Sequence, residues 1–71
     1  MVKFMLILQM CTVGICTNPV SDNLHYNSFK ECAINGYNRS IDFMNTIDEN
    51  TGNIQKPIVR FWCKEVEVSN A

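Results

Sequence analysis

The stretch Val2-Lys3-Phe4-Met5-Leu6-Ile7-Leu8-Gln9-Met10-Cys11 alternates in a way that predicts a β-strand. Successive side chains of a strand point to opposite faces of the sheet, so residues two apart share a face. One face is apolar throughout, and the other is apolar only at Met5 and Ile7, between Lys3 and Gln9. This pattern is typical of an inner strand that has one face on the core and one thinly covered face.

The same stretch has an alternative interpretation as a secretory signal peptide, because Lys3 precedes an apolar run. The run is broken at Gln9, and the best cleavage site follows Gly14, so that cleavage would remove residues 1–14. An odd number of cysteines would then remain in an oxidising compartment. We therefore favour the strand. The run is also too short to span a membrane, which takes roughly 20 apolar residues.

Residues 12–27 contain the turn-forming groups Gly14, Asn18-Pro19 and Ser21-Asp22-Asn23. They predict a long loop with a short edge strand at residues 24–26. A loop of this length without secondary structure is uncommon in a compact domain. We expect Cys16 to tie it down.

A helix is predicted to begin at Ser28, because Ser28-Phe29-Lys30-Glu31 is a capping box. Apolar residues follow at helical spacing and form a broad stripe. Within that stripe the small residues Cys32, Gly36 and Ser40 recur at every fourth position, which would let the helix backbone lie close to a sheet. We expect the helix to end near residues 48–50, before a turn at residues 51–53.

Residues 58–68 alternate and are rich in β-forming side chains, which predicts a final strand. The order strand, long loop, helix, strand predicts a small α+β (α/β) domain over residues 1–71, with one helix on a two- or three-stranded sheet. A right-handed crossover through the helix would make the first and last strands parallel. Val59, Phe61 and Cys63 would then face the helix.

Four cysteines in 71 residues indicate a cross-linked domain, since a chain this short buries only a small core. The crossover would gather all four thiols at one end, with two of them in the helix–sheet interface. We therefore predict the disulfides Cys32–Cys63 and Cys11–Cys16, with Cys11–Cys63 and Cys16–Cys32 as the alternative pairing. The same four cysteines could instead bind a structural zinc ion or remain reduced, as buried or reactive thiols.

The sequence lacks the patterns that are typical of catalysis. His25 is the only histidine, and no glycine-rich phosphate loop, acid pair or nucleophilic triad is visible. We predict a protein that is not an enzyme and has no cofactor or metal. A net charge of −1 provides no basic field for phosphate backbones, so nucleic-acid binding is not expected either.

The best candidate site is the strand face that carries Arg60, Trp62 and Lys64. Tryptophan and arginine are enriched at the hot spots of protein interfaces. We therefore predict that these three residues bind a protein partner or a second copy of the chain. The alternative is that Trp62 covers the second face of the sheet, with the basic side chains lying over it.

Three segments together resemble small uncharacterised proteins encoded by marine bacteriophages. They are residues 3–8 leading to Cys11, residues 26–32 with Gly36-Tyr37, and residues 59–65. The resemblance implies an accessory protein that acts on a host component, and it transfers no functional residue. A host cytoplasm would then be the location, whereas disulfides or a signal in residues 1–14 would imply the periplasm or the exterior. A secreted or structural disulfide-stabilised component is the remaining alternative.

Overall fold

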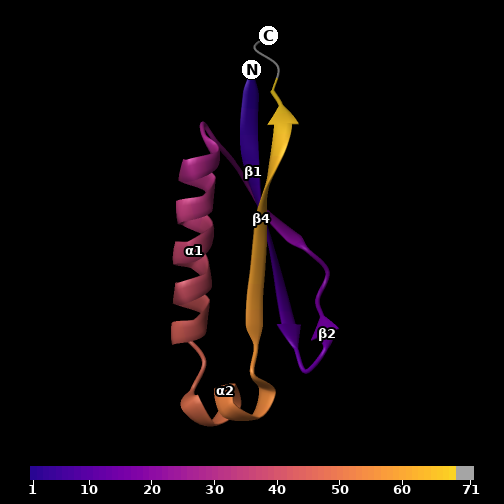
Figure 1. Cartoon of the computed structure of the whole chain (residues 1–71), viewed down its shortest axis with the longest axis vertical. Helices are drawn as coiled ribbons and strands as arrows, with labels where there is room; N and C mark the ends of the chain where they lie inside the picture. The colour runs from indigo at the N-terminus through magenta and orange to yellow at the C-terminus, as the bar shows by residue number, and fades with distance from the viewer. Residues whose placement is uncertain (69–71) are drawn as a thin grey trace.

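The structure is a computed structural model that describes residues 1–68, and it has a small α+β fold (Figure 1). A four-stranded antiparallel sheet is accompanied by two helices. The elements in chain order are β1 (Val2–Thr12), β2 (Ile15–Cys16), β3 (Val20–Tyr26), α1 (Phe29–Asn45), α2 (Glu49–Gln55) and β4 (Ile58–Glu67).

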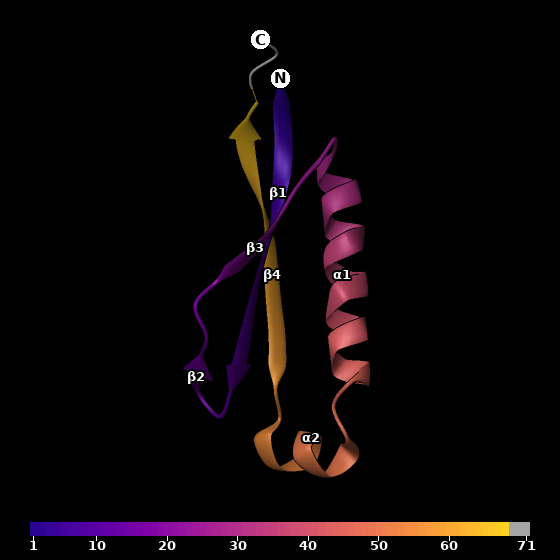
Figure 2. The same cartoon turned by 180° about the vertical axis from the view of Figure 1, so that it is seen from behind.

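Strand β1 is the centre of the sheet, as its alternating pattern predicts. It pairs with β4 over ten positions, from Val2↔Glu67 to Cys11↔Ile58, and with β3 and β2 along its other edge. The prediction that the first and last strands are parallel is wrong. Strand β3 returns the chain to the end at which β1 begins, so α1 runs in the same direction as β1 and β4 returns antiparallel to it (Figures 1 and 2).

The segment predicted as a long loop contains β2 and most of β3, so the expected strand at residues 24–26 begins earlier, at Val20. Val13 and Gly14 form a two-residue turn between β1 and β2, both with positive φ. Strand β3 bulges between its pairs with Ile7 and Met5. At the bulge, the Ser21 hydroxyl accepts a hydrogen bond from the Asn23 N–H. The Asp22 carboxylate accepts one from the Leu24 N–H.

The predicted helix start is confirmed, because α1 begins at Phe29 and the Ser28 hydroxyl accepts a hydrogen bond from the Glu31 N–H at 3.1 Å. The predicted helix end at 48–50 is wrong, and so is the turn at 51–53. Helix α1 ends at Asn45, and residues 49–55 form the second helix. Asp48 caps α2 by accepting from the Thr51 N–H at 2.9 Å, which compensates for the weak helix formers that follow.

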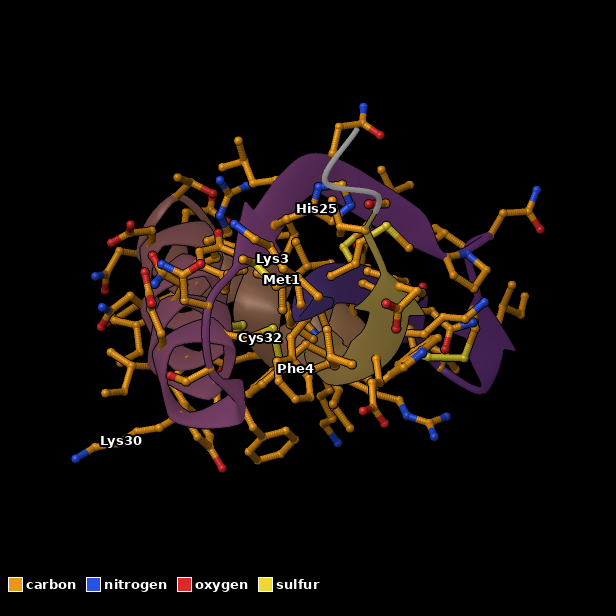
Figure 3. The ribbon with its side chains drawn as sticks, turned by 90° about the horizontal axis from the view of Figure 1, so that it is seen from above. Met1, Lys3, Phe4, His25, Lys30 and Cys32 are labelled. Atoms are coloured by element: carbon orange, nitrogen blue, oxygen red, sulfur yellow. A yellow bond between two sulfur atoms is a disulfide. The ribbon has the colours of Figure 1, made fainter. Side chains whose placement is uncertain are left out.

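The core lies between α1 and one face of the sheet and is small. Its fully buried side chains are Leu6 and Cys32, with Tyr26 beside them. Gly36 lies against Phe61 so closely that a Cβ there would overlap the aromatic ring, which confirms the close approach expected from the small residues. Viewed along the molecule's long axis, Cys32 lies between α1 and the sheet, whereas Lys30 points away (Figure 3).

Candidate functional site

The two disulfides are those predicted, but they lie in different parts of the molecule. Cys11–Cys16 joins β1 to β2 with a Cα–Cα distance of 4.0 Å, and Cys32–Cys63 joins α1 to β4 with a distance of 6.2 Å. The expectation that all four thiols gather at one end is wrong. Because β4 is antiparallel to β1, Cys63 pairs with Leu6 in the middle of β1, while Cys11 lies at the far end.

The zinc alternative required the four cysteines to converge on one point. All four are in disulfides, and none is a free thiol. Among residues 1–68, no group of three or more histidine, cysteine or acidic side chains is placed to hold a metal ion. The cysteines therefore have a clear structural role: one disulfide closes a hairpin, and the other fixes α1 to the sheet.

The predicted site residues Arg60, Trp62 and Lys64 lie together on the face of the sheet opposite α1. They are opposite Gln9, Ile7 and Met5 of β1, respectively. Figures 1 and 2 show α1 along one side of the sheet and no helix along the other. We refer to the uncovered side as the open face, and define it by the paired residues of β1, β3 and β4 that share it: Lys3, Met5, Ile7, Gln9, Cys11, Ser21, His25, Ile58, Arg60, Trp62, Lys64 and Val66.

Trp62 is the only aromatic side chain of the open face, and 40% of its surface is exposed. Met5 and Ile7 beside it are half-buried. The indole thus covers part of the sheet and also remains accessible. The structure places Trp62 over the second face of the sheet, and its role in binding a partner stays a prediction.

Charge is distributed unevenly between the two sides of the sheet. Three of the chain's six cationic residues, Lys3, Arg60 and Lys64, lie on the open face. None of the strand-paired positions on that face in residues 1–68 is acidic. Glu65 and Glu67 belong to the opposite side, because they pair with Phe4 and Val2. A chain with a net charge of −1 therefore has a locally basic face around its only tryptophan.

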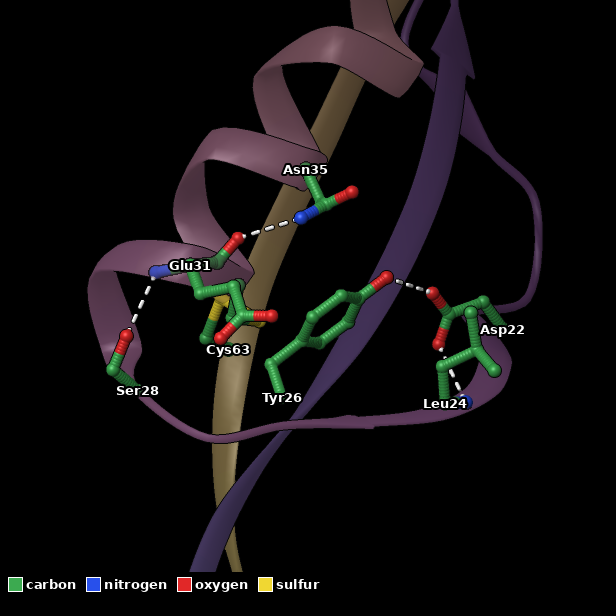
Figure 4. The surroundings of a disulfide bond; sticks show 8 residues. Asp22, Leu24, Tyr26, Ser28, Glu31, Asn35 and Cys63 are labelled. Carbon is green, nitrogen blue, oxygen red and sulfur yellow. Dashed lines mark hydrogen bonds between the residues drawn. A yellow bond between two sulfur atoms is a disulfide. The ribbon is translucent and has the colours of Figure 1, made fainter.

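A polar cluster missed by the sequence analysis lies beside the buried disulfide. The Tyr26 hydroxyl donates a hydrogen bond to Asp22 Oδ2 at 2.8 Å (Figure 4). The Arg39 guanidinium of α1 lies 3.6 Å from the same oxygen. Burial raises the pKa of Tyr26 above its ordinary value near 10, and the hydrogen bond to Asp22 raises it further. This cluster holds β3 to α1. The sequence did not predict this cluster, because Asp22 and Tyr26 lie in a turn-rich segment and nothing in their spacing indicates a contact with α1.

A hollow of about 600 Å³ opens between α1 and the region where β3 separates from β1. Leu8, Met10 and Phe43 contribute apolar surface, and Arg39 and Asp42 add opposite charges.

His25 lies on β3 opposite Met5, exposed at the edge of the open face. In the part of the chain that the structure describes, no helix is both long enough and apolar enough to cross a membrane.

Comparisons with protein families, with curated proteins and with solved structures found no match to this chain. The resemblance to bacteriophage proteins therefore stays a prediction, and function has to be argued from the molecule itself.

Proposed function

We propose that this chain is a non-enzymatic binding protein, and that its open face contacts an acidic surface of a partner protein. The observation that carries the proposal is the position of Trp62, which is exposed between Arg60 and Lys64 on a face that no helix covers. Aromatic and arginine side chains contribute much of the binding energy at protein interfaces.

The strand that carries these residues is held in place before any partner arrives. Strand β4 pairs with β1 over its full length, and the Cys32–Cys63 disulfide anchors its middle to α1. Binding loses free energy when side chains or loops must be ordered. A face built on an anchored strand avoids most of that cost, so a few contacts suffice for measurable affinity.

The charge of the open face selects the kind of partner. Cations surround the tryptophan, and the paired positions of the face carry no carboxylate within residues 1–68. Such a face attracts acidic surfaces and disfavours basic ones, because placing like charges against each other across an interface is costly. A partner segment that combines acidic with apolar side chains fits both Trp62 and its neighbours.

Single-stranded nucleic acid is the competing ligand, because aromatic and cationic side chains on a sheet can also stack bases. The net charge of −1 and the seven acidic residues disfavour a long phosphate backbone beyond the open face. We therefore favour protein, and include an oligonucleotide as a separate arm of the test.

The experiment is an array of short peptides that combine acidic with apolar residues, together with a thymidine oligonucleotide. It is probed with the oxidised full-length chain. Trp62→Ala is expected to lose at least about tenfold in affinity, as removal of a hot spot does. Lys64→Glu should lose a similar amount, and Lys30→Glu, which changes the net charge equally on α1, should bind within about twofold of the unmodified chain.

Equal losses for Lys64→Glu and Lys30→Glu would show that only net charge matters and would overturn the proposed site. Unchanged binding by Trp62→Ala would do the same. Tight, salt-dependent binding of the oligonucleotide with no peptide bound would replace the protein partner with nucleic acid.

A further inference from the structure

Strand β4 has an unpaired edge. Within residues 1–68, β1 is the only strand that pairs with it. The Val68 N–H donates to the Met1 carbonyl at 2.8 Å, which fixes the alternation of hydrogen bonds along the ladder. Even-numbered residues of β4 therefore direct their backbone groups toward β1. Odd-numbered residues direct theirs outward, and these are Val59, Phe61, Cys63, Glu65 and Glu67.

A groove runs between this edge and α1. One part, of about 550 Å³, is lined by Phe29, Ala33 and Tyr37 of α1 and by residues 59–63 of β4. A second part, of about 360 Å³, shares Val59 with the first and adds Ile41, Met44 and Ile58. The edge strand and the groove form one continuous surface along the side of the molecule.

The two flanks of α1 differ in polarity. The flank beside the β4 edge is mostly apolar, with Ser40 and Asn45 as its polar members, and its Tyr37 and Ile41 are 63% and 58% exposed. On the side of β3, α1 presents Arg39, which reaches Asp22. Among the exposed apolar side chains of α1, Phe29, Tyr37, Ile41 and Met44 therefore lie beside the unpaired backbone of β4. An unpaired strand edge with apolar surroundings is a template for another strand.

The solvent-accessible surface of the chain is also larger than expected for a compact monomer of this mass. The accessible surface is 5230 Å², whereas a compact monomer of 8.2 kDa exposes about 4,500 Å². The radius of gyration of 14.2 Å likewise exceeds the roughly 11 Å expected for 71 residues. The excess of about 700 Å² is close to the roughly 800 Å² that each partner buries in a standard interface.

We propose that the chain forms a twofold homodimer in which β4 pairs antiparallel with β4 of a second copy. The two sheets then become one eight-stranded sheet, and the apolar flanks of the two α1 helices meet across the axis. A second copy fits this surface better than an unrelated peptide. A single twofold axis would bring the β4 edge of one copy against the β4 edge of the other, and the apolar flank of one α1 against that of the other.

The charges of β4 restrict the register. A twofold axis perpendicular to the sheet pairs residues that share a face, so the axis passes through one residue position of the strand. An axis at Trp62 would place Arg60 opposite Lys64 twice, which is unfavourable. An axis at Phe61 or Cys63 places Trp62 opposite Arg60 or Lys64 instead, and a cation beside an indole ring is favourable. The dimer would also join the two open faces into one surface.

The test is sedimentation equilibrium of the oxidised full-length chain from about 1 to about 500 µM, the range in which weak interfaces of this size associate. We expect a reversible dimer. Glu65→Pro removes an outward N–H that β1 does not use, so it should preserve the fold and shift the dissociation constant at least about tenfold toward monomer.

Ile41→Glu places a charge on the apolar flank and should weaken the dimer similarly, whereas Asn38→Glu adds the same charge on the exposed polar side of α1. Asn38→Glu should dimerise like the unmodified chain. Far-UV circular dichroism checks that each variant folds. A monomer at every concentration would overturn the proposal, as would a dimer that Glu65→Pro and Ile41→Glu leave unchanged. Peptide binding to the open face is measured separately, so either proposal can fail alone.

Discussion

The two sides of strand β4 are used in opposite ways. On one side Val59, Phe61 and Cys63 lie under α1, where Cys63 is bonded to Cys32 and Phe61 contacts Gly36 and Tyr37. On the other side Arg60, Trp62 and Lys64 belong to the open face. Neighbouring residues of β4 therefore differ in role. Those on the covered side stabilise the fold, and those on the open side are accessible to a partner.

The strongest way to test this difference is to truncate two adjacent residues of β4. Phe61→Ala removes a ring that packs on Gly36 and forms an edge-to-face pair with Tyr37 at 4.8 Å. We expect it to lower the free energy of unfolding by about 3 kcal/mol. Trp62→Ala should lower it by less, because the indole is already 40% exposed. Urea unfolding of the oxidised proteins measures both, and a reversed order would contradict the assignment of the two sides.

The two disulfides should also differ in how much they stabilise the fold, and the one on the covered side of β4 should contribute more. Replacing Cys32 and Cys63 by serine opens a link between residues 31 apart and should cost roughly 3.7 kcal/mol in the chain-entropy estimate. Replacing Cys11 and Cys16, which are five apart, should cost roughly 2.2 kcal/mol. Thermal unfolding of the two double variants compares them. An equal loss would mean that the buried link contributes nothing beyond the hairpin link.

Replacing the two helical glycines by alanine should change the stability of the protein by smaller amounts and in opposite directions. Gly36→Ala forces a methyl group onto the Phe61 ring, and after the gain in helix propensity it should still destabilise the protein by about 1–2 kcal/mol. Gly52→Ala meets only Ile47 at 3.8 Å and should stabilise α2 by up to about 1 kcal/mol. Urea midpoints report both changes. A neutral Gly36→Ala would show that α1 is not closely packed on β4.

The smallest effect is a pH dependence on the covered side. Burial and Asp22 raise the pKa of Tyr26, so the folded state favours the neutral phenol. Its stabilising contribution is complete below the unfolded pKa near 10 and is lost as the pH rises through the folded pKa. Urea midpoints between about pH 9 and pH 11 should therefore fall less steeply in Tyr26→Phe than in the unmodified chain. Identical slopes would show that Tyr26 ionises freely.

Local patterns predicted much of this structure. The alternation of β1 and β4 and the disulfide Cys32–Cys63 depend on which residues share a face, and periodicity encodes this directly. The Ser28 cap depends on a local pattern of four residues. The direction of β4 was not predictable in that way. It depends on β3, whose turn-rich residues resemble a loop and become a strand only by pairing with β1.

The candidate site shows the same division. The common face of Arg60, Trp62 and Lys64 follows from strand alternation, and their selection as a site depended on residue type alone. The exposure of Trp62 depends on which side of the sheet α1 covers, a tertiary property. The contact between Asp22, Tyr26 and Arg39 joins β3 to α1 across a bulge, and no short-range pattern specifies it.

The most direct test of the central claim uses Trp62, which is the only tryptophan and therefore the only source of indole fluorescence. Its emission in the native, oxidised protein is measured with an anionic quencher, iodide, and a cationic one, caesium. An exposed indole beside Arg60 and Lys64 should be quenched by both, and more strongly by iodide, with the difference shrinking at high salt. Emission that neither ion quenches would show that Trp62 is buried, and stronger quenching by caesium would show that the open face is not basic; either result would contradict the assignment of the two sides of β4.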